Sequence, residues 1–107
     1  MEKLTEYIEL AQLCMVQCKE ELPDSLLISD HESHHYQLLK QGYDLRGHYF
    51  FKVRIHLHIS EAGKICILEN TTDIEIADFF LERGVPKTDL LPAFLPENTR
   101  KLAGFAV

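Results

Sequence analysis

The stretch HYFFKVRIHLHI, residues 48–59, decides the fold class of this chain. Apolar residues occupy every second position, which is the period of a β-strand that buries one face. This apolar set is Tyr49, Phe51, Val53, Ile55, Leu57 and Ile59. Under strict alternation the opposite face carries His48, Phe50, Lys52, Arg54, His56 and His58. The pattern predicts one long strand with a core face and a mostly polar face.

Shorter strands are predicted on both sides of this stretch. The loop Ser60–Gly63 leads into a strand over Lys64–Glu69, which forms a hairpin with the long strand. Upstream, Ser25–Ser29 and His35–Lys40 flank a polar loop and indicate a second hairpin. A turn is expected at residues 42–44, which begin with a glycine. Together these segments predict an antiparallel sheet.

Two helices are predicted around this sheet. Over residues 2–20 an apolar stripe recurs every three or four positions, with Tyr7 and Cys14 on its flank. The stripe is Leu4, Ile8, Ala11, Met15 and Cys18. About two and a half heptads could pair as a coiled coil, but so short a seam favours packing on the chain's own sheet. A second helix is predicted from a capping box at Thr72 and Glu75, ending at Gly84.

The segment that follows is apolar but rich in proline. Residues 90–95 lie between an aspartate and Pro96, which predicts an extended edge segment and then one helical turn opened by Pro96. No repeat or linker divides the chain, so residues 1–107 are expected to form a single domain. The fold class expected is α+β, with an antiparallel sheet of four to five strands, a long N-terminal helix and a second helix after the sheet.

Composition excludes several classes of function. With 17 acidic against 11 basic residues and a net charge of −6, independent binding of DNA or RNA is not expected. Apolar runs fall far short of the ~20 residues of a membrane-spanning helix, and the N-terminus lacks a basic signal region, so a cytoplasmic protein is expected. Three cysteines without a CxxC pair are expected to be reduced.

Six histidines are the unusual feature of the composition. His56 and His58 share a strand face, and Cys66 would complete a set of zinc-ligand types if the hairpin loop has three residues. With a four-residue loop Cys66 would face the core, and the sequence leaves this register open. The loop 30–35 brings carboxylates and imidazoles together but is also typical of a solvated turn. Cys14 and Cys18 lie one helical turn apart, where a core role is favoured over metal binding.

No catalytic or cofactor motif is visible. Acyl transfer would need a nucleophile elbow around one of the serines, and phosphoryl transfer would need the glycines of a phosphate-binding loop, both of which the sequence lacks. The sequence therefore predicts a protein that is not an enzyme and holds no cofactor. A small metal-dependent hydrolase that uses the surface histidines is the alternative.

The polar face of the long strand is locally basic in an acidic protein. It is either a solvated sheet face or a docking surface for an acidic or aromatic partner, formed by Phe50, Lys52, Arg54, His56 and His58. Strict alternation also predicts that Lys52 and Arg54 oppose protonation of the two histidines. A homo-oligomer, most simply a two-fold dimer, is expected because the N-terminal helix, the Phe50 face and the tail 90–95 all carry apolar surface.

From residue 30 to residue 107 the chain resembles the XisI family, the fdxN element excision controlling factors. The resemblance rests on Asp30, the run 35–39, Gly42, His56, Ile59, residues 63–65, Ile76, Ala77, residues 84–87, Asp89, Arg100 and the closing residues 104–107. Tyr43, His58, Cys66 and residues 91–94 depart from the family pattern. The resemblance implies a non-catalytic accessory factor in programmed excision of a DNA element. Its implied partners are a companion XisH-like nuclease-fold protein and a site-specific recombinase.

Overall fold

The fold consists of a five-stranded sheet with helices on one of its faces. The computed structural model describes residues 2–107. In chain order the elements are α1 (Glu2–Glu21), β1 (Leu26–Asp30), β2 (His35–Tyr43), β3 (Tyr49–Ile59), β4 (Ile65–Asn70), α2 (Ile76–Glu82), the 3₁₀ turn η1 (Lys87–Asp89), β5 (Leu90–Pro92) and α3 (Glu97–Ala103). The α+β class and the order of the main elements predicted from the sequence are confirmed.

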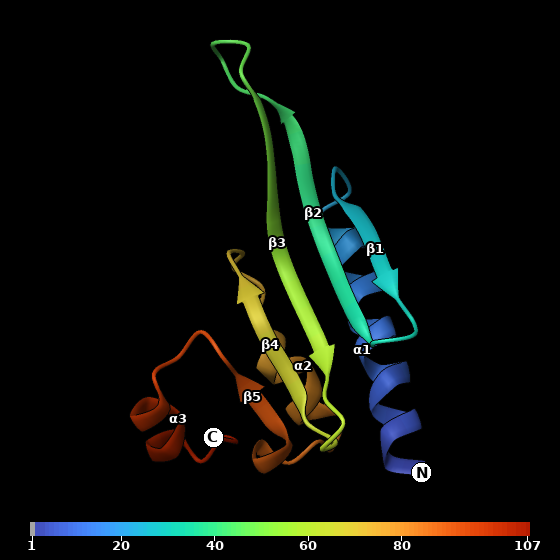
Figure 1. Cartoon of the computed structure of the whole chain (residues 1–107), viewed down its shortest axis with the longest axis vertical. Coiled ribbons are helices and arrows are strands. Elements are labelled where there is room, and N and C mark those ends of the chain that lie inside the picture. Colours follow the sequence, from blue (N-terminus) through green and yellow to red (C-terminus); the bar gives the residue numbers. More distant parts are fainter. Residues whose placement is uncertain (1) are drawn as a thin grey trace.

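The strands lie in the order β1-β2-β3-β4-β5. The first four pair antiparallel, as predicted, whereas β5 pairs parallel to β4 because α2 and η1 carry the chain back before β5 begins. Figure 1 shows α1 behind β1 and β2, and α2 behind β4, so that both helices cover the same face. We call this the helix face and the other the open face.

The core lies between the sheet and these helices. The residues of β2, β3 and β4 that pack against the helices are almost wholly buried, as are the helix residues that they contact. The central members are Ala11, Met15, Tyr36, Leu38, Ile55, Leu57, Ile59, Ile65 and Phe80. No helix within residues 2–107 is long and apolar enough to cross a membrane.

Helix α1 buries a stripe slightly rotated from the predicted one. Tyr7 and Cys14, expected on the flank, are 4% and 1% exposed, whereas Leu4 and Ile8 are only partly buried. The rotation follows from the contact with η1, because the Tyr7 hydroxyl reaches Asp89 across the end of the sheet. The helix therefore packs on its own sheet, as favoured, and its apolar stripe is not free for another chain.

A β-bulge divides the central hairpin into two parts. Leu38 pairs with Ile55 but Leu39 pairs with Val53, so Arg54 is an extra residue without a partner in β2. Below the bulge the hairpin is flanked by β1 and β4. Above it, residues 40–52 pair only with each other and project beyond the other elements (Figure 1). We call residues 40–52 the arm.

Three local expectations need correction. The arm's turn lies at residues 44–48 and not at 42–44, because the Asp44 carboxylate accepts hydrogen bonds from the amides of Arg46 and His48. The capping box at Thr72 does not form, because the Thr72 hydroxyl donates to Asn70 Oδ1 in a turn ahead of α2. The helical turn after Pro96 extends to seven residues in α3.

Residues that carry the family resemblance fasten the C-terminal segment. Arg100 donates to the carbonyl oxygens of Leu95 and Ala106 at 2.6 and 3.2 Å, and the Lys87 ammonium donates to Ala103 O at 3.2 Å. The Ala106 amide in turn donates to Leu90 O at 2.9 Å. These side chains therefore satisfy backbone carbonyls around α3 and hold the tail against β5.

Candidate functional site

The five residues predicted to share one partner-binding face lie on two faces. Strict alternation fails at Arg54, because the bulge inserts one residue and exchanges the faces of all residues beyond it. Phe50 and Lys52 pair with Gly42 and Lys40 on the helix face, whereas His56 and His58 pair with Gln37 and His35 on the open face. The predicted single basic face is therefore wrong, and each half belongs to a different surface.

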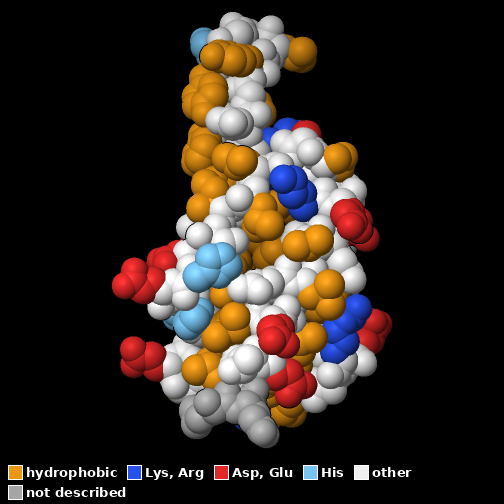
Figure 2. All heavy atoms as spheres, turned by 90° about the vertical axis from the view of Figure 1, so that its right-hand side faces the viewer, with side chains coloured by type: hydrophobic (Ala, Val, Ile, Leu, Met, Phe, Trp, Pro, Cys, Tyr) orange, Lys and Arg blue, Asp and Glu red, His pale blue; other side chains and the backbone are white. Residues whose placement is uncertain are grey.

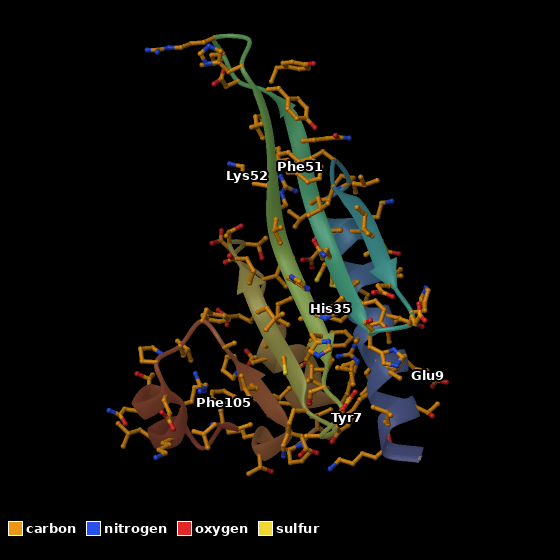
Figure 3. The ribbon with its side chains drawn as sticks, in the orientation of Figure 1. Tyr7, Glu9, His35, Phe51, Lys52 and Phe105 are labelled. Carbon is orange, nitrogen blue, oxygen red and sulfur yellow. The ribbon has the colours of Figure 1, made fainter. Side chains whose placement is uncertain are left out.

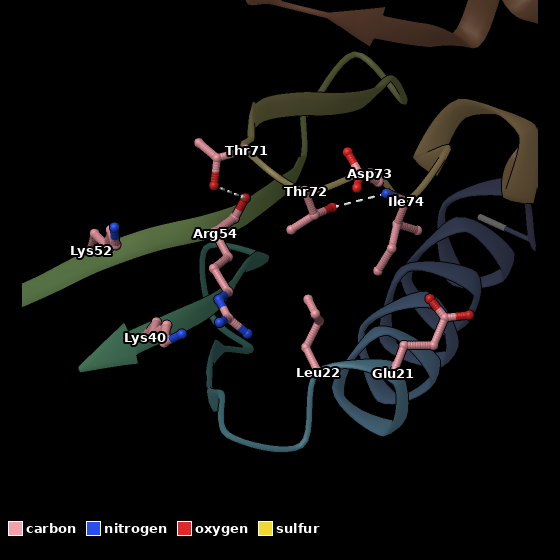
Figure 4. Close-up of a pocket in the computed structure, with 9 residues that line it drawn as sticks. All are labelled: Glu21, Leu22, Lys40, Lys52, Arg54, Thr71, Thr72, Asp73 and Ile74. Carbon is pink, nitrogen blue, oxygen red and sulfur yellow. Dashed lines mark hydrogen bonds between the residues drawn. The ribbon is translucent and has the colours of Figure 1, made fainter. Parts of the chain in front are cut away.

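The first half lines a groove at the base of the arm, on the helix face. This groove has a volume of about 600 Å³. It lies between the end of α1, the arm and the loop before α2 (Figure 4). Its lining residues are Glu21, Leu22, Lys40, Lys52, Arg54, Thr71, Thr72, Asp73 and Ile74. We call it the basic groove because its three cations outnumber its two carboxylates, Glu21 and Asp73, in a chain of net charge −6.

Two of these cations are held by one carboxylate. Arg54 donates to Asp24 Oδ1 at 3.0 Å and to the Ser25 hydroxyl at 2.7 Å, and Lys40 lies 3.3 Å from Asp24 Oδ2. The hydrogen bond from Arg54, followed by that from Lys40, lowers the pKa of Asp24. Asp24 thus anchors the bulge to the loop after α1.

Lys52 is the third cation of the groove, and Asp24 does not pair with it. Its ammonium lies 5.2 Å from the centroid of the Phe50 ring, and none of the ion pairs found within residues 2–107 uses it. Figure 3 shows Lys52 on the arm next to Phe51. The Phe50 ring crosses the backbone at Gly42, where an added Cβ would lie 3.3 Å from the ring. Glycine therefore allows the ring to lie flat on the arm beneath the lysine.

The second half of the predicted face joins a cluster of three histidines on the open face. His35 Nδ1 lies 2.9 Å from His56 Nε2, and the His35 and His58 rings stack with centroids 4.0 Å apart. Burial lowers the pKa of His35 and of His56, and the neighbouring imidazoles lower both further. The charges that oppose protonation are therefore other histidines and not Lys52 and Arg54, as alternation predicted.

Cys66 lies opposite His58, which settles the register that the sequence left open. The Ser60 amide donates to Lys64 O, so three residues, 61–63, remain in the loop, and this is the alternative that predicted Cys66 opposite His58. Cys66 is nonetheless 7% exposed, and burial raises the pKa of its thiol. No three histidine, cysteine or acidic side chains within residues 2–107 are grouped so as to hold a metal ion.

The other metal or acid–base candidates have structural partners. Asp30 accepts hydrogen bonds from the amides of Glu32 and Ser33 and so closes the turn between β1 and β2. Cys14 and Cys18 are buried in the core, as favoured, and their mutual hydrogen bond, together with burial, raises the pKa of the Cys14 thiol. All three cysteines are free, as expected for reduced thiols.

One buried polar cluster was not predicted from the sequence as a site. Asp89, 5% exposed, accepts a hydrogen bond of 2.5 Å from the Tyr7 hydroxyl and forms ion pairs with Lys3 and Lys64 at 2.6 and 3.2 Å. Burial by itself would raise the pKa of Asp89, but these three donors lower it to about 2. The cluster joins α1, the β3–β4 loop and η1. Its only signal in the sequence was the presence of Lys64 and Asp89 among the residues that carry the family resemblance.

Fold and site together define a class: a small α+β protein that presents an open groove on one face of its sheet and exposed apolar residues on the other. The sequence profile of the XisI family, described as XisI protein, matches residues 1–107. The chain therefore belongs to the XisI family, as the resemblance indicated.

Two solved structures are similar to this one over nearly their whole length. The fdxN element excision controlling factor XisI from Anabaena variabilis is 32% identical, with a TM-score of 0.81 and 97% of each chain covered. A XisI-like protein from the same organism is 28% identical, with a TM-score of 0.83, covering 97% of this chain and 98% of that one. No curated protein sequence matches the chain.

Proposed function

We propose that this chain is a non-catalytic excision controlling factor, which acts by holding a partner protein in the basic groove. The partner proposed is an XisH-like nuclease-fold protein, with a site-specific recombinase as a possible third member of the complex. Membership of the XisI family and the name of the relative from Anabaena variabilis support a regulatory role. Independent binding of nucleic acid is not part of the proposal, because the net charge is −6.

The observation that carries the proposal is the unpaired charge of Lys52 in the groove. Lys40 and Arg54 are already compensated by Asp24, so Lys52 offers its charge to an acidic side chain of a partner. Leu22 and Ile74 supply an apolar lining beside it, and the Phe50 ring extends the same surface along the arm. An acidic segment with an apolar side chain fits this combination.

Co-purification from the native host tests the proposal. Tagged wild-type chain is expected to capture the XisH-like companion, and Lys52→Glu to reduce the captured amount at least about tenfold, equivalent to roughly 1.4 kcal/mol of binding free energy. The matched control is Lys101→Glu, which makes the same charge change on α3. Absence of the companion and of a recombinase from the captured proteins, or an equal loss with the control, would contradict the proposal.

A further inference from the structure

The open face of the sheet carries an apolar patch that no segment within residues 2–107 covers. Its large side chains are exposed by 42–72%, namely Leu26, Ile28, Tyr43, Tyr49 and Phe51. The register places them in adjacent rows that cross β1, β2 and β3. Figure 2 shows hydrophobic side chains running along one side of the arm, with histidine side chains lower on the same side of the molecule.

Three successive rows of this patch contain no charged residue. From the tip downward the rows pair Tyr43 with Tyr49, Gln41 with Phe51, and then Leu26 with Leu39 and Val53. The two tyrosine rings meet edge to face at 5.5 Å, and the Tyr49 hydroxyl donates to Gln41 Oε1 at 2.9 Å. The Tyr49 hydroxyl and Gln41 Oε1 therefore satisfy each other, and the aromatic rings and aliphatic side chains make up most of the surface of these rows.

The charge pattern selects a second copy of this chain as the occupant. With a net charge of −6, two copies repel each other, and they can approach closely only where the surface lacks charge. The three uncharged rows provide such a surface in a chain with 28 charged residues. A two-fold axis would place the same patch on both sides of the contact, so apolar surface meets apolar surface.

The size of the patch agrees with this occupant. Five half-exposed large side chains offer on the order of 500 Å² of apolar surface, near the upper end for a monomer. An interface of standard size buries ~800 Å² on each partner, so this patch alone would supply more than half of that area. The arm gives a second reason to expect a dimer. A two-stranded ribbon without a packed face is marginally stable in water, and a second copy would cover one of its faces.

We infer that two copies of this chain form a dimer by packing their open faces together, with Phe51 and Tyr49 of each arm at the centre. The surfaces first expected to drive assembly are not those used here. Most of the α1 stripe packs on the sheet, Phe50 lies on the helix face, and in the tail 90–95 Leu90 is buried whereas Phe94 stays 51% exposed, away from the open-face patch. The dimer leaves the basic groove free for the partner proposed above.

Light scattering coupled to size-exclusion chromatography tests the inference on the full chain. At about 100 µM, above micromolar dissociation constants, wild type is expected at twice 12.4 kDa. Phe51→Glu is expected to raise the dissociation constant about 100-fold or more, because the symmetric contact loses an aromatic anchor twice and gains two like charges. Ile28→Glu repeats the test on β1 if the first variant does not fold.

Two control variants place the same charge off the open face. Leu45→Glu lies at the tip of the arm and Leu102→Glu lies on α3, and both leucines are more than 90% exposed. Both variants are expected to remain dimeric. A wild-type mass near 12.4 kDa, or dissociation of the controls as strong as that of Phe51→Glu, would overturn the inference. Capture of the companion protein is a separate readout, so loss of the dimer and failure of the groove proposal are distinguishable.

Discussion

The two ends of the β2–β3 hairpin have similar apolar sequences but opposite surroundings. Below the bulge, Leu38, Ile55 and Leu57 are fully buried under the helices. Above it, Tyr43, Tyr49 and Phe51 are more than half exposed on the other face. One inserted residue produces this difference, because it exchanges the faces of the strand without interrupting its alternation. Apolar periodicity therefore identifies a strand reliably, but it does not show that all its apolar residues enter the same core.

Alanine substitutions below and above the bulge are expected to differ most in how much they lower the free energy of unfolding. Leu57→Ala removes a fully buried side chain and is expected to lower the free energy of unfolding by about 2–5 kcal/mol. Phe51→Ala is expected to cost less than about 1 kcal/mol in the monomer, since its ring is 53% exposed. Urea denaturation of both variants at low protein concentration measures the difference. Equal losses would show that the arm belongs to the cooperative core after all.

Asp89 tests how α1 is attached to η1 in the part of the molecule below the bulge. Because its pKa is lowered from 3.8 to about 2, the folded state favours the carboxylate, and this stabilisation is present above pH 3.8. It is lost as the pH falls through about 2, by roughly 2 kcal/mol. Asp89→Asn is expected to remove a similar amount at neutral pH and to flatten this part of the acid unfolding profile. An unchanged profile in the variant would show that Asp89 does not tie α1 to η1.

The histidine cluster lies on the open face, where the hairpin meets β4. Its expected effect on stability is smaller and depends on pH. Burial and mutual repulsion lower the pKa of His35 and His56 below 6.5, although Asp30 partly opposes this for His35. Stability is therefore full above pH 6.5 and decreases as the pH falls below it, because the unfolded chain then binds more protons. His35→Gln with His56→Gln is expected to reduce the change in the urea midpoint between pH 7 and pH 5. A slope retained in the double variant would assign it to other groups.

The helices and strands of this fold could be predicted from the sequence, but the arrangement of the candidate sites mostly could not. Strand period, helix stripes and the glycine after α2 are local signals, and they predicted elements that the structure confirms. The bulge at Arg54 has no glycine or proline to mark it and depends on the contact with Asp24 and Ser25, some 30 residues away. The adjacent apolar pair Leu38–Leu39, with both residues buried, was the one available sign that β2 buries both faces at this point. Pairing of β5 with β4 and the Asp89 cluster also depend on contacts between distant segments.

The bond between Tyr7 and Asp89 spans 82 residues, and this separation affects when the fold can be completed during synthesis. A ribosome that adds 5–20 residues per second needs roughly 4–16 s to proceed from one residue to the other. During that interval α1 can associate with the first hairpins, but its first turns have no acceptor for Tyr7 and Lys3. The N-terminal helix is therefore synthesised first but secured last, and the chain reaches its native state only after η1 has been made.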